Sequence, residues 1–80
     1  MKREEIKAEL QNIFKDIFNL KEPLVETIVA KDVPDWDSLN HIRLMMTIQK
    51  KMSVHFTTLE LTAFKNIGEL ISLIERKKVK

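Results

Sequence analysis

Apolar residues recur at helical spacing in several parts of the chain. In the first of these parts the pattern is one stripe of i, i+4 and i+7 positions: Ile6, Leu10, Ile13, Phe14 and Ile17. The stripe predicts a helix from about Lys2 to Phe18. Glu4 and Glu5 suit its positive N-terminal turn, and Asn19 can end it in a left-handed conformation.

Residues 38–52 predict a second helix, but with two apolar stripes instead of one. The stripe expected to face the core is Leu44, Met45, Ile48 and Met52. The stripe on a neighbouring face is Leu39, Ile42 and Met46. Because a small domain has a modest core, two interpretations stay open. Either the helix is buried on a wide face, or the second stripe is an exposed docking surface to which the flexible Met46 adapts.

The C-terminal third predicts two further helices. Thr57 and Glu60 have the spacing of a capping box, which favours a short helix over 57–61. Asn66 and Glu69 give an asparagine version of that signal and open a last helix. Its apolar stripe is Ile67, Leu70, Ile71 and Ile74, and Gly68 within it is a mild local cost. Its basic end is Arg76, Lys77, Lys78 and Lys80, where the helix dipole favours cations.

Residues 20–37 show no clear period. Their apolar anchors are Leu24, Val25, Ile28 and Val29, and Pro23 and Pro34 discourage a continuous helix. We expect a packed loop with one helical turn, and so long a connection suggests a functional role. The predicted fold is an all-α, small antiparallel bundle of three main helices plus one short helix, formed by residues 1–80 as a single domain.

Composition removes several classes of function. The 80 residues contain no cysteine, so a disulfide framework, a thiolate metal site and a cysteine nucleophile are excluded. No apolar run is long enough to span a membrane, and the first residues do not resemble a signal peptide. We therefore expect a cytoplasmic, monomeric protein without membrane insertion.

Charge is distributed unevenly although the net charge is only +2. Residues 19–37 carry two basic and five acidic side chains. Residues 38–52 carry Arg43, Lys50 and Lys51 and no acid. This pattern is compatible with an acidic partner or a nucleic acid, although a charged face is more often simply solvated.

The start of the second helix is the candidate site. Asp37 is a good N-cap residue, and Ser38 follows at the first helical position. The free amides and the dipole at a helix N-terminus favour an anion, so Ser38 is well placed to carry a phosphate ester. The plainer alternative is that the two residues only start the helix. Trp36 is expected to pack the end of the loop onto the second helix.

Nothing in the sequence indicates a catalyst. His41 lies one turn after Asp37, a spacing that suits a metal, but two ligands do not make a site. Neither His41 nor His55 has an obvious serine to activate, and no phosphate-binding glycine loop is present. We therefore expect no metal and no enzymatic activity, and we expect Ser38 to be modified by another enzyme.

Asp37-Ser38-Leu39 and the helix that follows resemble the prosthetic-group site of the acyl carrier proteins. The resemblance covers nearly the whole chain: first helix, long loop, Asp-Ser-Leu, second helix, short third helix and final helix. It implies that a phosphopantetheinyl transferase moves 4′-phosphopantetheine from coenzyme A onto Ser38. The arm's thiol would hold an acyl group as a thioester. The arm would then present that group to acyl-loading, acyl-modifying or acyl-transferring enzymes, or fold back between the helices.

The resemblance also gives the second stripe a use, because partner enzymes of this family dock along the helix after the serine. It implies a docking surface of Leu39, Ile42, Arg43, Met46 and Lys50. Two departures stand out: Trp36 replaces a common glycine, and the usually acidic docking positions read Asn40, Arg43, Gln49, Lys50 and Lys51. We therefore expect a specialised carrier for lipid or secondary metabolism, not the housekeeping fatty-acid carrier, since complementary charge governs partner choice.

Three alternatives remain. Within the carrier class, an aminoacyl or peptidyl carrier uses the same attachment chemistry. A helical nucleic-acid-binding domain would use the basic helix 38–52, but the acidic loop at its N-terminus would repel phosphates. The third is a protein-interaction bundle in which Ser38 is never modified.

Overall fold

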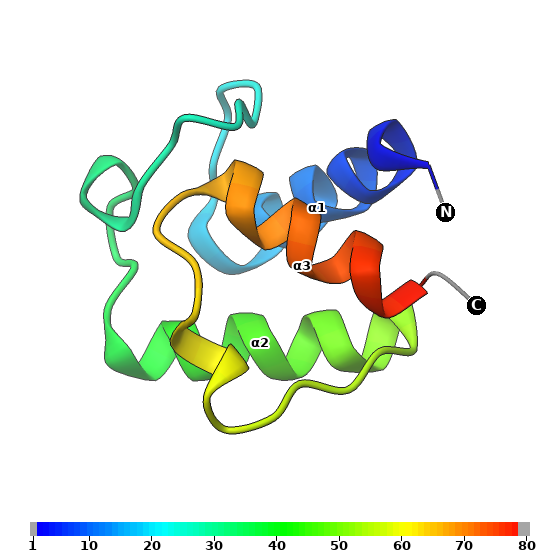
Figure 1. The fold of residues 1–80 in the computed structure, drawn as a ribbon. Helices are drawn as coiled ribbons and strands as arrows, with labels where there is room; N and C mark the ends of the chain where they lie inside the picture. The colour runs from blue at the N-terminus through cyan, green and yellow to red at the C-terminus, as the bar shows by residue number, and fades with distance from the viewer. Residues whose placement is uncertain (1, 79–80) are drawn as a thin grey trace.

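The computed structural model describes residues 2–78, and within them the chain is all-helical (Figure 1). The helices are α1 (Arg3–Phe18), α2 (Ser38–Met52) and α3 (Ile67–Lys78), with 3₁₀ turns η1 (Ala30–Asp32) and η2 (Glu60–Thr62) in the connections. Helix α1 packs against both α2 and α3 and runs in the opposite direction to each (Figure 1). The predicted all-α bundle is confirmed.

The helix ends follow from local chemistry. Helix α1 ends at Asn19, which adopts the expected left-handed conformation with φ of 55°. Helix α2 ends at Ser53, which is left-handed with the same φ. Helix α3 begins after Asn66, whose side chain accepts a hydrogen bond of 2.9 Å from the Glu69 amide. Each predicted long helix is therefore bounded as the capping chemistry indicates.

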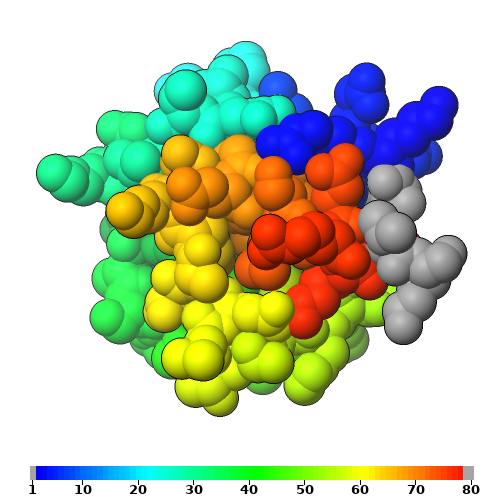
Figure 2. Space-filling view, viewed as in Figure 1, coloured from blue at the N-terminus to red at the C-terminus, as the bar shows by residue number. Residues whose placement is uncertain are grey.

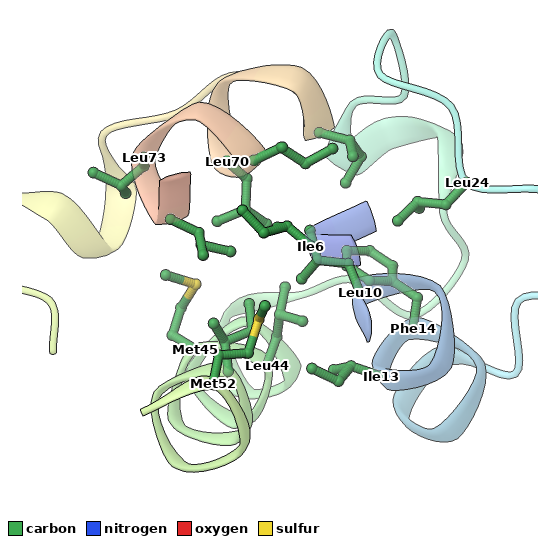
Figure 3. Packing of buried hydrophobic residues seen from close by; sticks show 14 of the residues in the cluster. Ile6, Leu10, Ile13, Phe14, Leu24, Leu44, Met45, Met52, Leu70 and Leu73 are labelled. Atoms are coloured by element: carbon green, nitrogen blue, oxygen red, sulfur yellow. The ribbon is translucent and has the colours of Figure 1, made fainter. Parts of the chain in front are cut away.

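The core lies where the three main helices meet (Figure 3). The residues that α1 buries are Ile6, Leu10, Ile13, Phe14 and Phe18, while Ile17 is only partly buried. The stripe that α2 buries is the predicted one, Leu44, Met45, Ile48 and Met52. The residues that α3 buries are Ile67, Leu70, Ile71, Leu73 and Ile74. Among the described residues no polar side chain is buried, so apolar packing holds these helices together.

The short third helix, predicted over 57–61, is present only as the single 3₁₀ turn η2 (Glu60–Thr62), which begins later and is shorter than expected. The capping box does form, with the Thr57 amide donating to Glu60 Oε1 at 2.9 Å and the Glu60 amide donating to Thr57 Oγ1 at 3.3 Å. Only the single 3₁₀ turn η2 follows it. The turn buries none of its residues, and the preceding Leu59 is 84% exposed. Since helix nucleation is costly, one turn without a buried face does not extend.

The long connection is a packed loop with one helical turn, η1, as expected. Two of its apolar residues differ from the prediction. Val25 is 45% exposed and anchors nothing, whereas Val33, which was not singled out, is buried. The neighbouring Leu24 is buried, and the side chain of Gln11 bonds its amide and the carbonyl of Glu22. Val25 stands at the start of a turn, since its carbonyl accepts a hydrogen bond of 3.2 Å from the Ile28 amide.

The basic end of α3 contacts specific groups in addition to any dipole effect. Lys77 forms an ion pair with Glu60 of η2. Lys78 donates a hydrogen bond of 2.7 Å to the carbonyl of Met52, at the C-terminal end of α2. These contacts tie the end of α3 to η2, which Figure 2 shows in yellow, and to the end of α2. Lys80 lies outside the described residues.

Candidate functional site

Helix α2 begins at the candidate serine. The Oδ1 atom of Asp37 accepts a hydrogen bond of 2.9 Å from the Asn40 amide, so Asp37 is the N-cap as predicted. Ser38 is the first residue of α2 and is exposed. The side chain of Asn40 reaches back and donates to the carbonyl of Asp35 at 2.8 Å, across a turn in which Asp35 has a φ of 70°. Asn40 thus braces the turn before the serine, a role that its position on the helix did not reveal.

A groove runs beside Ser38, with a volume of about 530 Å³. We call it the first groove, and it is lined by Ala30, Trp36, Asp37, Ser38, His41, Ile42 and Thr62. Its walls come from η1, the end of the long loop, the first turn of α2, and η2. The lining of this groove is mostly apolar.

Trp36 and His41, which both line this groove, form one hydrogen-bonded unit. Trp36 Nε1 donates to His41 Nδ1 at 3.0 Å, and His41 Nε2 lies 2.7 Å from the carbonyl oxygen of Leu61. The indole N–H only donates and the carbonyl only accepts. The two contacts together therefore assign His41 the neutral tautomer with its proton on Nε2. Both ring nitrogens are engaged, and neither is directed to Asp37 for a metal site.

The same unit lies in an aromatic column. The ring centroids of Trp36 lie 5.3 Å from Phe14, 5.5 Å from Phe18 and 6.1 Å from His41. His41 in turn stacks on Phe64 at 5.7 Å. The predicted structural role of Trp36, packing the loop end onto α2, is what these contacts provide. The sequence did not indicate that His41 would join it.

The second stripe of α2 is exposed, so the interpretation in which a wide face of the helix is buried is wrong. The exposed fractions of Leu39, Ile42 and Met46 are 68%, 56% and 63%. We call these three residues the docking stripe, after the role that the sequence led us to expect. Arg43 and Lys50 are exposed beside them. Within residues 2–78, no carboxylate forms an ion pair with either of these two cations.

A second groove begins where the first one ends. The two share His41, Ile42 and Thr62. The second groove has a volume of about 480 Å³ and lies between α2 and the segment with η2. Its other lining residues are Met45, Met46, Gln49, Thr58, Leu59 and Leu61.

No protein-family model and no curated protein sequence matches the chain. A solved structure does match it: the solution NMR structure of a holo acyl carrier protein from Geobacter metallireducens. The two share 30% sequence identity with a TM-score of 0.81, over 90% of this chain and 84% of that one. The element order, the bundle and this similarity define a carrier protein. The chain belongs to the acyl carrier protein family.

Within residues 2–78, no cluster of three or more His, Cys, Asp or Glu side chains is arranged to hold a metal ion. None of the helices described is long and apolar enough to cross a membrane.

Proposed function

We propose that Ser38 is the attachment site of 4′-phosphopantetheine and that residues 1–80 act as one cytoplasmic carrier domain. The observation that carries the proposal is the placement of Ser38, exposed at the first position of α2 with the first groove beside it. The similar Geobacter protein is a holo acyl carrier protein, which supports the same cofactor here. When bound, 4′-phosphopantetheine supplies a thiol that holds an acyl group as a thioester.

The residues around Ser38 fit a phosphodiester. The N-terminus of α2 carries a partial positive charge and amides without helical partners. The Asp37 carboxylate is occupied by the Asn40 amide, which keeps it in its capping position. The arm would extend from Ser38 over Trp36 and His41, which line the first groove.

The docking stripe and the cations beside it are the proposed contact surface for enzymes that load, modify or transfer the acyl group. An exposed apolar patch with a polar rim is typical of a protein interaction site. Because the rim carries Arg43 and Lys50 and α2 has no acidic residue, we assign this carrier to partners with neutral or acidic docking sites. We therefore propose that it acts in a specialised lipid or secondary-metabolite pathway and is not the housekeeping fatty-acid carrier.

The aminoacyl or peptidyl carrier remains the main alternative within the class, since the attachment chemistry is identical. The nucleic-acid interpretation is weakened by the exposed docking stripe. Leu39, Ile42 and Met46 occupy the outer face of α2, where a base-reading helix needs polar groups.

Intact mass spectrometry tests the attachment site directly. The protein is incubated with coenzyme A and a broad-specificity phosphopantetheinyl transferase. We expect a gain of one phosphopantetheinyl group in the wild type and in Ser53→Gly, and no gain in Ser38→Ala. Ser53 is the matched control, because it is also exposed and its left-handed conformation suits glycine. A gain that persists in Ser38→Ala, or none in the wild type with several transferases, would refute the proposal.

A further inference from the structure

A column of four aromatic rings runs from the first groove, which Trp36 and His41 line, to Phe14 in the hydrophobic core. We call Phe14, Trp36, His41 and Phe64 the aromatic floor. These rings form a continuous column from α1, through the end of the long loop and the first turn of α2, to the segment after η2. Phe14 belongs to the buried core, whereas Trp36 and His41 line the first groove. An acyl chain that enters the core from Ser38 has to displace part of this column.

Hydrogen bonds fix the column at its centre. His41 accepts from Trp36 at 3.0 Å and donates to the Leu61 carbonyl at 2.7 Å. One imidazole therefore joins three segments: the loop end, α2 and η2. Moving η2 away from α2 to admit a chain would leave the imidazole N–H and the carbonyl without their partners, and an alkyl chain offers no replacement.

The residues behind the floor belong to the buried core. Leu44, Met45 and Ile48 of α2 are 0–1% exposed, and Ile67, Leu70 and Ile71 of α3 are fully buried. In Figure 3, Leu44 and Met45 of α2 and Leu70 of α3 lie in the interior between the helices. A chain that passed the floor would enter this buried apolar region, so the aromatic floor is the barrier on the route from Ser38.

The remaining route for cargo is the second groove, and it conflicts with docking. Its wall includes Ile42 and Met46, which belong to the docking stripe. A long chain in this groove would cover side chains that a partner enzyme must contact. A short or polar acyl group avoids the conflict, because it gains little from burial and can stay at the end of the arm.

From these contacts we infer that His41 is a specificity-determining residue that keeps the acyl group out of the helical core, and that this carrier takes short or polar acyl groups. The inference rests on the proposed attachment at Ser38. His41 acts through Trp36 and Leu61 as a positioning residue, and it takes no part in the chemistry of loading.

The test compares carriers loaded from acetyl-, octanoyl- and hexadecanoyl-coenzyme A by the same transferase, each verified by intact mass. In the wild type, we expect melting temperatures within about 2 °C of one another and unchanged emission from Trp36, the only tryptophan. In His41→Val, the hexadecanoyl form should melt about 4–8 °C above the acetyl form, because the core now admits the chain. Phe64→Leu removes the ring at the other end of the column. It replaces His41→Val in the comparison if that variant does not fold, and the same difference in melting temperature is expected.

Gln11→Ala is the control for simple loosening of the bundle. Gln11 also makes two hydrogen bonds that tie a helix to a loop, but away from Ser38. The Gln11→Ala variant should have a lower melting temperature than the wild type in all three acylated forms. The decrease should be the same for each chain length. A wild-type protein whose melting temperature rises with chain length would overturn the inference. So would melting temperatures that do not depend on chain length in both His41→Val and Phe64→Leu. Failure of loading would instead count against the proposed function.

Discussion

The amide of Gly68 donates a hydrogen bond of 2.9 Å to the carbonyl oxygen of Glu26, which ties the long loop to the first turn of α3. The approach is close, because a Cβ built on Gly68 would lie 3.2 Å from Glu26 Cβ and 3.3 Å from its carbonyl oxygen. Arg3 closes the junction from α1, donating to Glu26 and to the Gly68 carbonyl. The only glycine of the chain thus stands where three segments meet.

Gly68→Ala should therefore destabilise the protein by about 1 kcal/mol, although alanine is the better helix former by a similar amount. The Glu26 carbonyl cannot withdraw from a new methyl group without breaking its bond to the Gly68 amide. Urea unfolding measures the change as a lower midpoint at constant slope. A midpoint above that of the wild type would show that the loop yields and that helix propensity dominates.

Acid should weaken the same junction. The hydrogen bond from Arg3 lowers the pKa of Glu26 below its ordinary value of 4.5, and Lys77 does the same for the pKa of Glu60. A carboxylate with a lowered folded-state pKa contributes stability above its unfolded pKa and loses it as the pH falls through the folded value. The free energy of unfolding should thus decline from about pH 5 downward.

The double variant Glu26→Gln, Glu60→Gln provides the comparison. It removes both carboxylates whose pKa values are lowered, so its unfolding free energy should fall less steeply over the same pH range. Both ion pairs are partly exposed, and added salt should reduce the difference between the proteins. Identical pH profiles for the two proteins would show that these pairs do not account for the acid sensitivity.

Features of the fold that depend only on residues close together in the sequence could be predicted. The bounds of α2 follow from the Asp37 cap and its buried stripe, and the structure gives the same residues, Ser38–Met52. The exposed stripe could be identified as apolar but not as exposed. Its burial depends on whether another segment covers it, and a periodic pattern does not contain that information.

The features that escaped prediction join residues far apart in the sequence. His41 lies 20 residues from Leu61, and Gly68 contacts Glu26 only because the loop folds onto α3. Local propensity cannot indicate such pairs. The short length of η2 also depends on distant parts of the chain. Its capping box was predicted correctly from the sequence, but the sequence did not indicate that the turn would bury none of its residues.

The N-cap residue Asp37 should contribute measurably to the stability of the protein. Asp37→Ala should lower the unfolding free energy by about 1 kcal/mol, because the Asn40 amide loses its acceptor. The unfolding free energy of Asp37→Asn should stay within a few tenths of a kcal/mol of the wild-type value, since asparagine caps equally well. Thermal or urea unfolding of the three proteins measures this. Equal stability of Asp37→Ala and wild type would mean that the cap contributes nothing.

The charge of α2 should decide which enzymes accept the carrier. Fatty-acid-synthesis enzymes recognise carriers whose docking helix is usually acidic, so the holo protein should be a poor substrate for a malonyl transferase of that pathway. The double variant Arg43→Glu, Lys50→Glu should raise kcat/KM about tenfold at low salt, because complementary charge increases the encounter rate. Added salt should reduce that gain.

Lys15→Glu, Lys21→Glu is the matched control for this charge reversal. Both lysines are exposed, and both lie outside α2, on α1 and the loop that follows it. The control changes net charge by the same amount but leaves the docking stripe and its basic rim intact, so it should leave kcat/KM within about twofold of the wild type. A wild-type carrier used as well as the enzyme's own carrier would refute the assignment to neutral or acidic partners. An equal gain in both double variants would attribute the effect to net charge, not to the surface of α2.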